Sequence, residues 1–191
     1  MKTVQIHSRR SRSEAGSSLI EVLVAGLVFM VGLMGGMTLI VTAIASNNRS
    51  KMDSTATLIA QKTLEKIASV PANATATSTP SSTVTITDCN PDSSQVTHFV
   101  DTLGTSGGAG AALSGGNIDF SSAKVTGYSM TYYACQTSTG DEQGRYDVRW
   151  YVKTLTAKAK LVVIAAERIG TETGSARLFA RPVSLKMIVG L

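Results

Sequence analysis

Hydrophobic residues are concentrated in one run near the start of the chain. The 24 residues from Val22 to Ala45 carry no charge, and only Thr38 and Thr42 place a hydroxyl among apolar residues and glycines. A helix of that length is about 36 Å long, which exceeds the ~30 Å hydrocarbon core of a bilayer. A helix of a soluble domain would keep a polar face, which this run lacks. The pattern therefore predicts a helix that spans a membrane.

Beyond this run the apolar residues recur at helical spacing. One face of such a helix carries Met52, Ala56, Ile59, Ala60, Thr63, Leu64 and Ile67. Leu58 breaks the pattern, and Pro71 stops the helix because the residue before a proline disfavours helical geometry. We predict one long helix over about residues 18–69. Its membrane half covers residues 17–46, and its amphipathic half, residues 47–70, has to cover a hydrophobic core.

The last third of the chain is typical of β-strands. Strand-like segments cover residues 128–136, 145–154, 160–169 and 183–190, with the clearest alternation in "RYDVRWYVKT". The turn-forming segments "TSTGDEQG" and "TAKA" join the first three as hairpins, which predicts an antiparallel sheet over residues 128–190. We expect Trp150 to pack in the core, the alternative being exposure to a partner.

The connection between helix and sheet is rich in serine, threonine and glycine. Segments such as "NATATSTPSST" and "GTSGGAGAALSGGN" predict a flexible loop over residues 71–127, with short strands only at residues 84–88 and 95–100. A globular head would then span residues 71–191. The predicted fold class is α+β, with a long N-terminal helix packed on a C-terminal antiparallel β-sheet.

Positive charge is concentrated in the first 16 residues. The formal net charge is +5, and Lys2, Arg9, Arg10 and Arg12 against Glu14 supply +3 of it. The remainder is too small to indicate a nucleic-acid partner, and we expect none by default. Basic residues that flank a membrane helix stay in the cytoplasm, which places the chain from residue 47 onward on the outer side.

Two cysteines, Cys89 and Cys135, lie in the polar part of the chain. On the exported side of a membrane they are expected to form a disulfide, and two buried free thiols are the alternative. Two cysteines and two histidines, one of them in the basic leader, do not suit a standard four-ligand zinc site. We expect neither a metal nor a cofactor.

Ala15 and Gly16 separate the basic leader from the apolar run. In an ordinary secretory signal the small-residue cleavage site follows the apolar stretch. Cleavage after Gly16 would instead remove the leader, residues 1–16, and leave the membrane helix attached. Glu21 lies at the head of that helix, where a carboxylate costs about 2.5–3.5 kcal/mol on insertion. It needs a proton or a partner, such as the new α-amino group of a neighbouring chain, the alternative being that the side chain reaches the lipid headgroups and has no role in assembly.

The stretch "GSSLIEVLVA", which begins at Gly16, resembles the class III signal of type IV prepilins and pseudopilins. In that family a dedicated peptidase cuts after the glycine and methylates the new amino terminus, and the fifth mature residue is a glutamate. Glu21 is fifth when Ser17 is first. The resemblance implies cleavage between Gly16 and Ser17, an N-methylated Ser17 and an assembly role for Glu21. Ser17 departs from the pattern of major pilins, which usually have Phe there.

The segments "VGLMGGMTL" and "STATLIAQKTLEKIASVP" extend the resemblance to PilV-type minor pilins over about residues 10–71. The resemblance implies a type IV pilin-like fold, in which the amphipathic half of the helix lies across the sheet. It implies as partners the prepilin peptidase, other major and minor pilins, and the assembly platform of the inner membrane. The expected location is the bacterial inner membrane, with a single span and a periplasmic C-terminal domain, and then the pilus on the cell surface.

Gly32 and Gly36 form a G-x-x-x-G pair in the membrane run. Each glycine weakens a water-exposed helix by ~1 kcal/mol relative to alanine. In a membrane or a filament such glycines permit close approach of helix backbones, so we predict a packing face. The pattern is common in membrane helices.

No arrangement of residues indicates an enzyme. His98 lacks an evident nucleophile, and no recognisable catalytic turn is present in the sequence. Three acidic residues lie around a turn, but their spacing fits no calcium-binding loop. They are Asp141, Glu142 and Asp147. Three lysines near two aromatic residues offer a candidate nucleic-acid face, although a solvated hairpin is the default interpretation. These residues are Lys153, Lys158 and Lys160, beside Trp150 and Tyr151.

The expected function is that of a minor pilin, which is processed and then incorporated in a type IV pilus or in the complex that primes its assembly. A minor pseudopilin of a type II secretion system is the alternative within the family. A pilin with an adhesive or DNA-binding head and an ordinary membrane-anchored enzyme are the alternatives from other classes.

Overall fold

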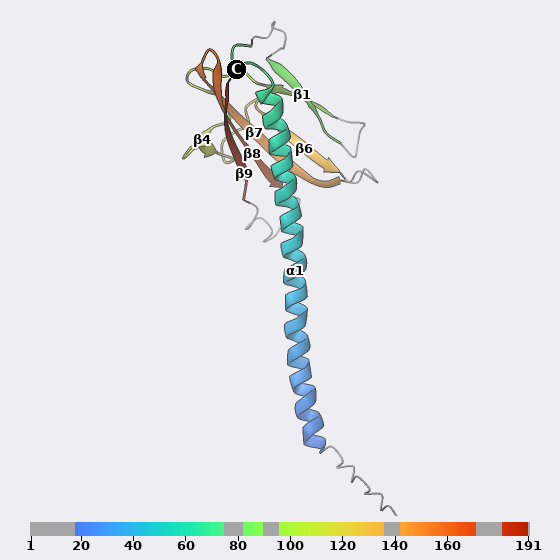
Figure 1. Cartoon of the computed structure of the whole chain (residues 1–191). Coiled ribbons are helices and arrows are strands. Elements are labelled where there is room, and N and C mark those ends of the chain that lie inside the picture. Colours follow the sequence, from blue (N-terminus) through green and yellow to red (C-terminus); the bar gives the residue numbers. More distant parts are fainter. Residues whose placement is uncertain (1–17, 75–81, 90–95, 136–141, 171–180, 191) are drawn as a thin grey trace, which may run out of the picture. The chain divides into compact units, whose positions relative to one another are not determined.

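The structure is a computed structural model that describes residues 18–74, 82–89, 96–135, 142–170 and 181–190 (Figure 1). The predicted leader and cleavage site, including Gly16 and Ser17, lie outside the described residues. The chain divides into two compact units, residues 1–46 and residues 47–191. One helix, α1 (Leu19–Ala68), runs through the described part of the first unit and continues into the second. The second unit also holds the antiparallel sheet, so the fold class is α+β, as predicted.

Helix α1 begins and ends where its sequence signals place it. The backbone N–H groups of Glu21 and Val22 donate to the carbonyl oxygen of Ser18, which closes the first turn. Glu21 in the first turn and Lys66 in the last turn complement the helix dipole. The turn after Ala68 leads directly into Pro71, which cannot continue the helix. The predicted helix over residues 18–69 is confirmed.

The amphipathic half of α1 buries the face that the spacing predicts. Its buried residues are Ala56, Ile59, Ala60, Thr63 and Ile67. Leu58, which breaks the spacing, is 65% exposed. The buried face packs in one cluster with residues of the sheet, among them Val148, Trp150 and Ile164. This half of the helix therefore covers one face of the sheet and forms the main core.

The main sheet consists of antiparallel strands centred on a long hairpin. Its strands are β6 (Ser129–Cys135), β7 (Glu142–Thr156), β8 (Ala159–Ile169) and β9 (Val183–Gly190), with the two-residue β3 (Ala109–Gly110) beside β7. The order is β3-β7-β8-β9, and β6 pairs with β7. Alternate β7 residues, from Tyr146 to Val152, face the core. All four predicted strands of the last third, and the antiparallel pairing, are confirmed.

A separate hairpin is formed by β1 (Thr83–Thr87) and β2 (Thr97–Asp101). These strands match the two short strands predicted in the connection within about two residues. Ile86 and Val100 bury one side of the hairpin in the main core. Residues 75–81 and 90–95 of the predicted loop lie outside the described residues.

The glycine-rich segment differs from the prediction of a flexible loop. Besides β3 it contains β4 (Leu113–Ser114) and β5 (Asn117–Ile118), which pair with each other. Gly108 and Gly110 have φ of 94° and 107°, and a Cβ at either would collide with β7 at the Tyr151 ring or the Trp150 carbonyl. The glycines are thus required for close approach to the sheet, and flexibility is not what they provide here.

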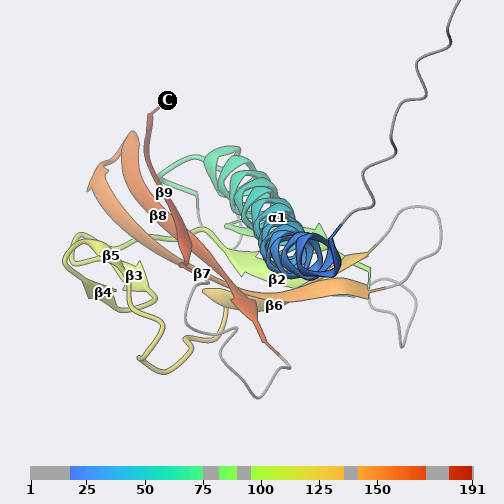
Figure 2. The same cartoon turned by 90° about the horizontal axis from the view of Figure 1, so that it is seen from below.

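A small second core lies on the face of the sheet away from α1. Ala111 and Ile118 of the glycine-rich segment pack there on Val163 and Ala165 of β8. Neighbouring β8 residues such as Ile164 face the main core, because side chains alternate between the faces of a strand. The β4–β5 pair lies on the side of β7 and β8 opposite to α1 (Figure 2).

Candidate functional site

The membrane half of α1 leaves its apolar surface uncovered. Every large hydrophobic side chain from Leu19 to Ile44 is at least 51% exposed. The helix is long and apolar enough to span a membrane. So large an apolar surface needs lipid or other apolar helices around it, since an isolated helix in water would leave it exposed. The first unit therefore has the character of a membrane anchor.

Glu21 occupies the first turn of this anchor. It is the last charged residue before Arg49, so the whole apolar run separates it from the next charge. The N-terminal turn of a helix favours a negative charge by about 0.3–1 kcal/mol in exposed positions. That is less than the cost of about 2.5–3.5 kcal/mol for a carboxylate in the centre of a membrane. The local helix alone does not offset burial of this carboxylate in lipid.

The two threonines of the run satisfy their hydroxyls inside the helix. The Oγ1 of Thr38 donates to the Gly35 carbonyl at 2.8 Å, and the Oγ1 of Thr42 donates to the Thr38 carbonyl. Such bonds to the preceding turn allow a hydroxyl to face lipid without an unmet donor. The threonines are therefore compatible with a membrane environment, and Glu21 remains the distinctive polar group of this segment.

Gly32 and Gly36 have open space around them. A Cβ built at either position would meet no atom of the chain within 4 Å, and the same holds for Gly26 and Gly35. No contact within the described chain thus requires these residues to be glycine. The predicted packing face stays a prediction about contacts with other helices.

The predicted disulfide between Cys89 and Cys135 is present. Cys89 follows β1 directly, and Cys135 is the last residue of β6. Their Cα atoms are 6.1 Å apart. The bond ties the β1–β2 hairpin to the main sheet, with which the hairpin shares no strand ladder.

A buried carboxylate next to the disulfide was not expected from the sequence. Asp88 is 4% exposed, and its Oδ2 accepts a hydrogen bond from the Tyr133 backbone N–H at 2.8 Å. The Nε2 of His98 lies 2.9 Å from the same oxygen. Asp88 and His98 are ten residues apart, and the antiparallel pairing of β1 with β2 brings them together. The pair fastens the hairpin to β6. Among the described residues, no serine or cysteine side chain forms a hydrogen bond with Asp88 or His98.

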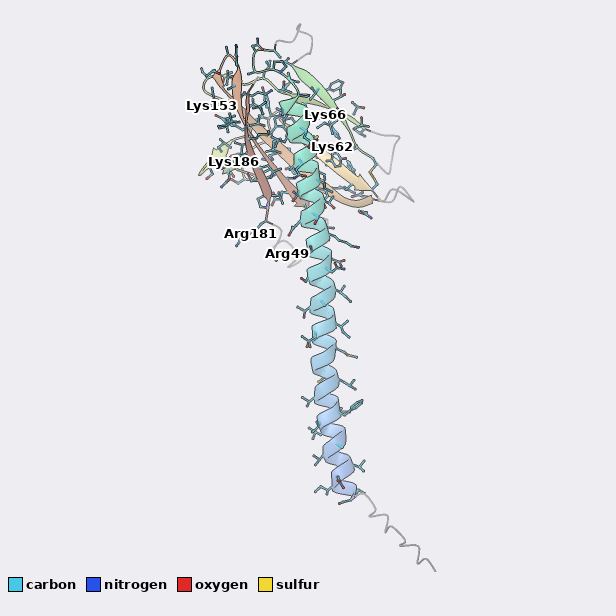
Figure 3. The ribbon with its side chains drawn as sticks, in the orientation of Figure 1. Arg49, Lys62, Lys66, Lys153, Arg181 and Lys186 are labelled. Atoms are coloured by element: carbon cyan, nitrogen blue, oxygen red, sulfur yellow. A yellow bond between two sulfur atoms is a disulfide. The ribbon has the colours of Figure 1, made fainter. Side chains whose placement is uncertain are left out.

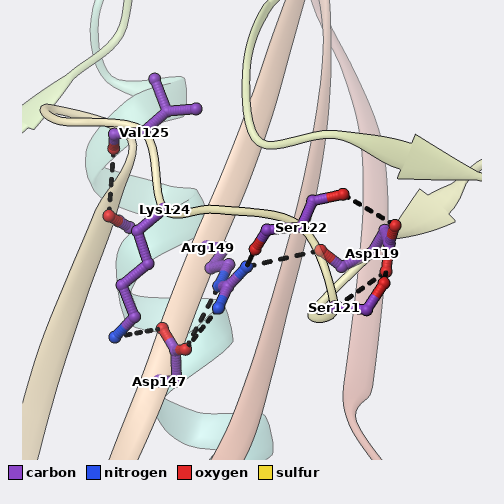
Figure 4. A network of polar contacts seen from close by, with 8 residues as sticks. Asp119, Ser121, Ser122, Lys124, Val125, Asp147 and Arg149 are labelled. Carbon is purple, nitrogen blue, oxygen red and sulfur yellow. Dashed lines mark hydrogen bonds and ion pairs between the residues drawn. The ribbon is translucent and has the colours of Figure 1, made fainter.

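The acidic residues predicted around the β6–β7 turn do not form one site, because Glu142 and Asp147 pair with different basic residues. The Nε of Arg145 donates to Glu142 at 2.8 Å. Asp147 accepts from Arg149 at 2.9 Å and lies 3.1 Å from the Nζ of Lys124 (Figure 4). Asp141 lies outside the described residues. Among the residues that the structure describes, no three potential metal-ligating side chains gather in one place.

Arg149 has a structural task in the same network. Its Nη1 donates to the Ser122 carbonyl at 2.6 Å and to the Asp119 carbonyl at 3.4 Å (Figure 4). Its guanidinium also lies over the Phe120 ring, 5.0 Å from the ring centre. The buried cation thus holds the segment between β5 and β6 on the back of the sheet.

Two residues of the basic and aromatic group, for which a solvated hairpin was the default and a nucleic-acid face the alternative, are buried. Lys160 is 1% exposed, and its Nζ donates to the Ile67 carbonyl at 2.8 Å. Trp150 is fully buried, and its Nε1 donates to the Asp101 carbonyl at 2.9 Å. The expectation that Trp150 packs in the core is confirmed, whereas Lys160 cannot reach a phosphate. Alternation along β8 places Lys160 toward the helix, which the sequence alone did not reveal.

Lys160 instead completes the end of α1. The last carbonyl groups of a helix have no partner within the helix, and a cation there also suits the helix dipole. The ammonium group supplies one such partner at Ile67, in the last turn of the helix. Burial lowers the pKa of Lys160 from 10.5 to about 8.

This pKa gives a signed prediction for stability. Between pH 8 and 10.5 the unfolded state binds the Lys160 proton more tightly than the folded state does, so the free energy of unfolding rises with pH. Below pH 8 the cost of the buried charge is present in full. Relative to Lys160→Met, the full chain in detergent is expected to gain about 2–3 kcal/mol between pH 7.5 and 10.

The measurement is denaturant unfolding of both proteins across that pH range. Burial raises the pKa values of Tyr128 and Tyr146, which lowers stability above about pH 10 in both proteins alike. The difference between wild type and variant therefore isolates Lys160. Parallel curves for the two proteins would show that Lys160 does not titrate in this window.

Basic side chains of the described residues are distributed over α1 and the sheet. Lys62 and Lys66 project from α1, while Lys153 and Lys186 lie over the sheet (Figure 3). Comparisons with protein-family models, with curated proteins and with solved structures find no match to this chain. The distinctive site is therefore the apolar half of α1 with Glu21 at its head.

Proposed function

We propose that this chain is a minor pilin, which a prepilin peptidase processes and which enters a type IV pilus or primes its assembly. One observation carries the proposal: an exposed apolar helix follows a basic leader that ends in Gly16, and Glu21 is the acidic residue in its first turn. Cleavage after Gly16 makes Glu21 the fifth residue of the mature chain. The resemblance to class III signals rests on the same residues.

The proposed chemistry is electrostatic. The α-amino group freed at Ser17 is a cation, and Glu21 of a neighbouring subunit is its natural partner in an apolar bundle. Pairing offsets the cost of both charges in a medium of low dielectric constant. Because the pair forms between subunits, it favours packed helices over isolated ones and sets their axial register. The α+β layout, with the amphipathic half of α1 across the sheet, is compatible with a pilin head.

Processing gives the most direct test. When the full-length chain is produced with an active prepilin peptidase, its intact mass is expected to fall by the mass of residues 1–16, apart from one added methyl group. Without the peptidase the mass should remain that of the full chain. A Gly16→Val chain is the matched control, because the bulkier residue blocks the cleavage position while the apolar run is unchanged.

An unshifted mass in the presence of the active peptidase would contradict the proposal. A minor pseudopilin would be processed in the same way, so a second measurement is needed to separate the two assemblies. The mature chain is expected in pili sheared from the cell surface, and its deletion should reduce piliation. Loss of protein secretion with normal piliation would favour the pseudopilin instead.

A further inference from the structure

A pocket of about 460 Å³ opens beside the disulfide of the head. Its walls come from four elements: Leu58, Ile59 and Lys62 on α1, the end of β1, Tyr132 on β6, and Gln143 on β7. The Cys89–Cys135 bond lies in the wall as well. Pockets of 300–1,000 Å³ are the usual size for ligand sites, and one of this volume also accepts one or two side chains of a protein partner.

Lys62 is held in a fixed position at this pocket. Its Nζ donates to the Thr87 carbonyl and to the Tyr132 hydroxyl, both at 3.2 Å. It also lies 5.3 Å from the centre of the Tyr132 ring. All three partners are neutral, and an ammonium group has three N–H donors. No ion pair among the described residues includes Lys62.

The carboxylate that lines the same pocket is directed elsewhere. Asp88 engages His98 and the Tyr133 backbone through its Oδ2, and its Oδ1 is buried. The pocket therefore presents a positioned cation to an incoming group. A cation that is already ordered suits an anion, because the entropy of fixing the lysine side chain is lost on folding and not on binding.

Leu58 adds an apolar contact at the same place. It projects from α1 away from the main core, is 65% exposed and lines the pocket together with Lys62. An exposed leucine by itself needs no explanation, but one beside a positioned cation favours a ligand with an acidic and an apolar group close together. A polypeptide segment supplies both within one or two residues.

We propose that the Lys62 pocket receives an aspartate or glutamate side chain of a neighbouring pilin subunit, with an apolar residue of that subunit on Leu58. The inference rests on the proposed function, because it takes the partner from the same assembly. It is favoured by the charge of Lys62, by the size of the pocket and by its place on α1, the helix whose membrane half has to pack on neighbouring helices. The pocket would thus extend the subunit interface from the anchor to the head.

The first test compares two lysines of the same helix in the full chain. Lys62→Met is expected to lower the amount of the protein in sheared pili roughly fivefold or more, because it removes a charge from the interface. Lys62→Arg should retain most incorporation. The matched control is Lys66→Met, since Lys66 is exposed one turn further along α1 and does not line the pocket. Equal incorporation of all four proteins, wild type included, would overturn the proposal.

A structural role of Lys62 is separated by measuring the variants before assembly. Formation of the Cys89–Cys135 bond and the unfolding temperature are expected to stay near wild type in Lys62→Arg. If Lys62→Met unfolds early, a photo-reactive residue at position 58 gives an independent measurement in a chain that keeps Lys62. An adduct with a pilin peptide that contains Asp or Glu supports the proposal, and adducts with lipid alone, or with a peptide lacking both, overturn it.

The decisive experiment exchanges the charges of Lys62 and of the acidic residue on the partner. Lys62→Glu is expected to lose incorporation, and changing the crosslinked acidic residue of the partner to lysine should restore it at least partly. Failure of the exchange would overturn the pairing. If the wild-type chain is processed and enters pili, and no Lys62 variant changes its incorporation, this inference is wrong and the minor-pilin function still stands. If the wild-type chain is never processed, the proposed function itself is wrong.

Discussion

A chain that carries Glu21→Val is expected to enter the membrane and to be processed, yet to be absent from sheared pili. Valine makes the apolar run longer, so membrane insertion should be at least as favourable. The proposed peptidase signal depends chiefly on Gly16 and the basic leader, so cleavage is expected to persist. What is lost is the anionic partner that the proposed function assigns to the amino terminus of a neighbouring subunit. An unpaired charge in a medium of low dielectric constant costs several kcal/mol, which corresponds to a loss of 100-fold or more in assembly.

The measurement is immunodetection in sheared pili and in isolated inner membranes, with the intact mass determined for each fraction. Thr42→Val is the matched control, because it also removes a polar group from the same helix, and its hydroxyl bonds only within the helix. This control should reach pili at wild-type levels. Wild-type amounts of Glu21→Val in pili would show that intersubunit pairing does not depend on Glu21.

Much of the fold is predictable from local patterns in this sequence. The switch from a uniformly apolar run to a helical spacing locates both halves of α1, and the burial of Ile59 and Ile67 with exposure of Leu58 follows from the same spacing. The strands of the last third alternate or are rich in β-branched and aromatic residues. In both cases the signal lies in neighbouring residues, which is why it is readable without the structure.

The failures concern interactions between distant residues. The glycine-rich segment has a loop-like composition, but Gly110 packs its backbone against Trp150 forty residues later. Lys160 follows directly after the β7–β8 turn, where a lysine is ordinarily solvated, and only the packing of β8 under α1 brings it to Ile67. Asp88 meets His98 only because β1 pairs with β2, and it meets the Tyr133 N–H only because the hairpin packs beside β6. Composition cannot reveal such contacts, since the same residues elsewhere would be solvated.

The candidate functional residues were also predictable only in part. Glu21 is conspicuous in the sequence because a single carboxylate heads an apolar run, and its cost in lipid is a local property. Lys62 is ordinary in the sequence, since charged residues on the outer face of an amphipathic helix are the rule. Its fixed position depends on Thr87 and Tyr132, which the fold brings to it from two strands. The head pocket was therefore not predictable, whereas the anchor was.

Replacement of both cysteines, in a Cys89→Ser/Cys135→Ser chain, is expected to destabilise the head by about 4 kcal/mol. The bond closes a loop with a sequence separation of 46 residues, and the chain-entropy relation gives that magnitude for a loop of this length. Changing both residues avoids a reactive free thiol. The full chain in detergent, unfolded by denaturant with and without a reducing agent, gives the measurement, and the reduced wild type should match the double variant.

The loss should also be uneven across the head. The β1–β2 hairpin shares no strand ladder with the main sheet, so besides the disulfide it is held by contacts such as the Asp88 bond to the Tyr133 N–H and the burial of Ile86 and Val100. Amide hydrogen exchange in residues 83–87 and 97–101 is therefore expected to accelerate more than exchange in β7 and β8, which pair along their length. A uniform change, or a loss below about 1 kcal/mol, would mean that the hairpin is held chiefly by its buried side chains and that the disulfide adds little to the folded head.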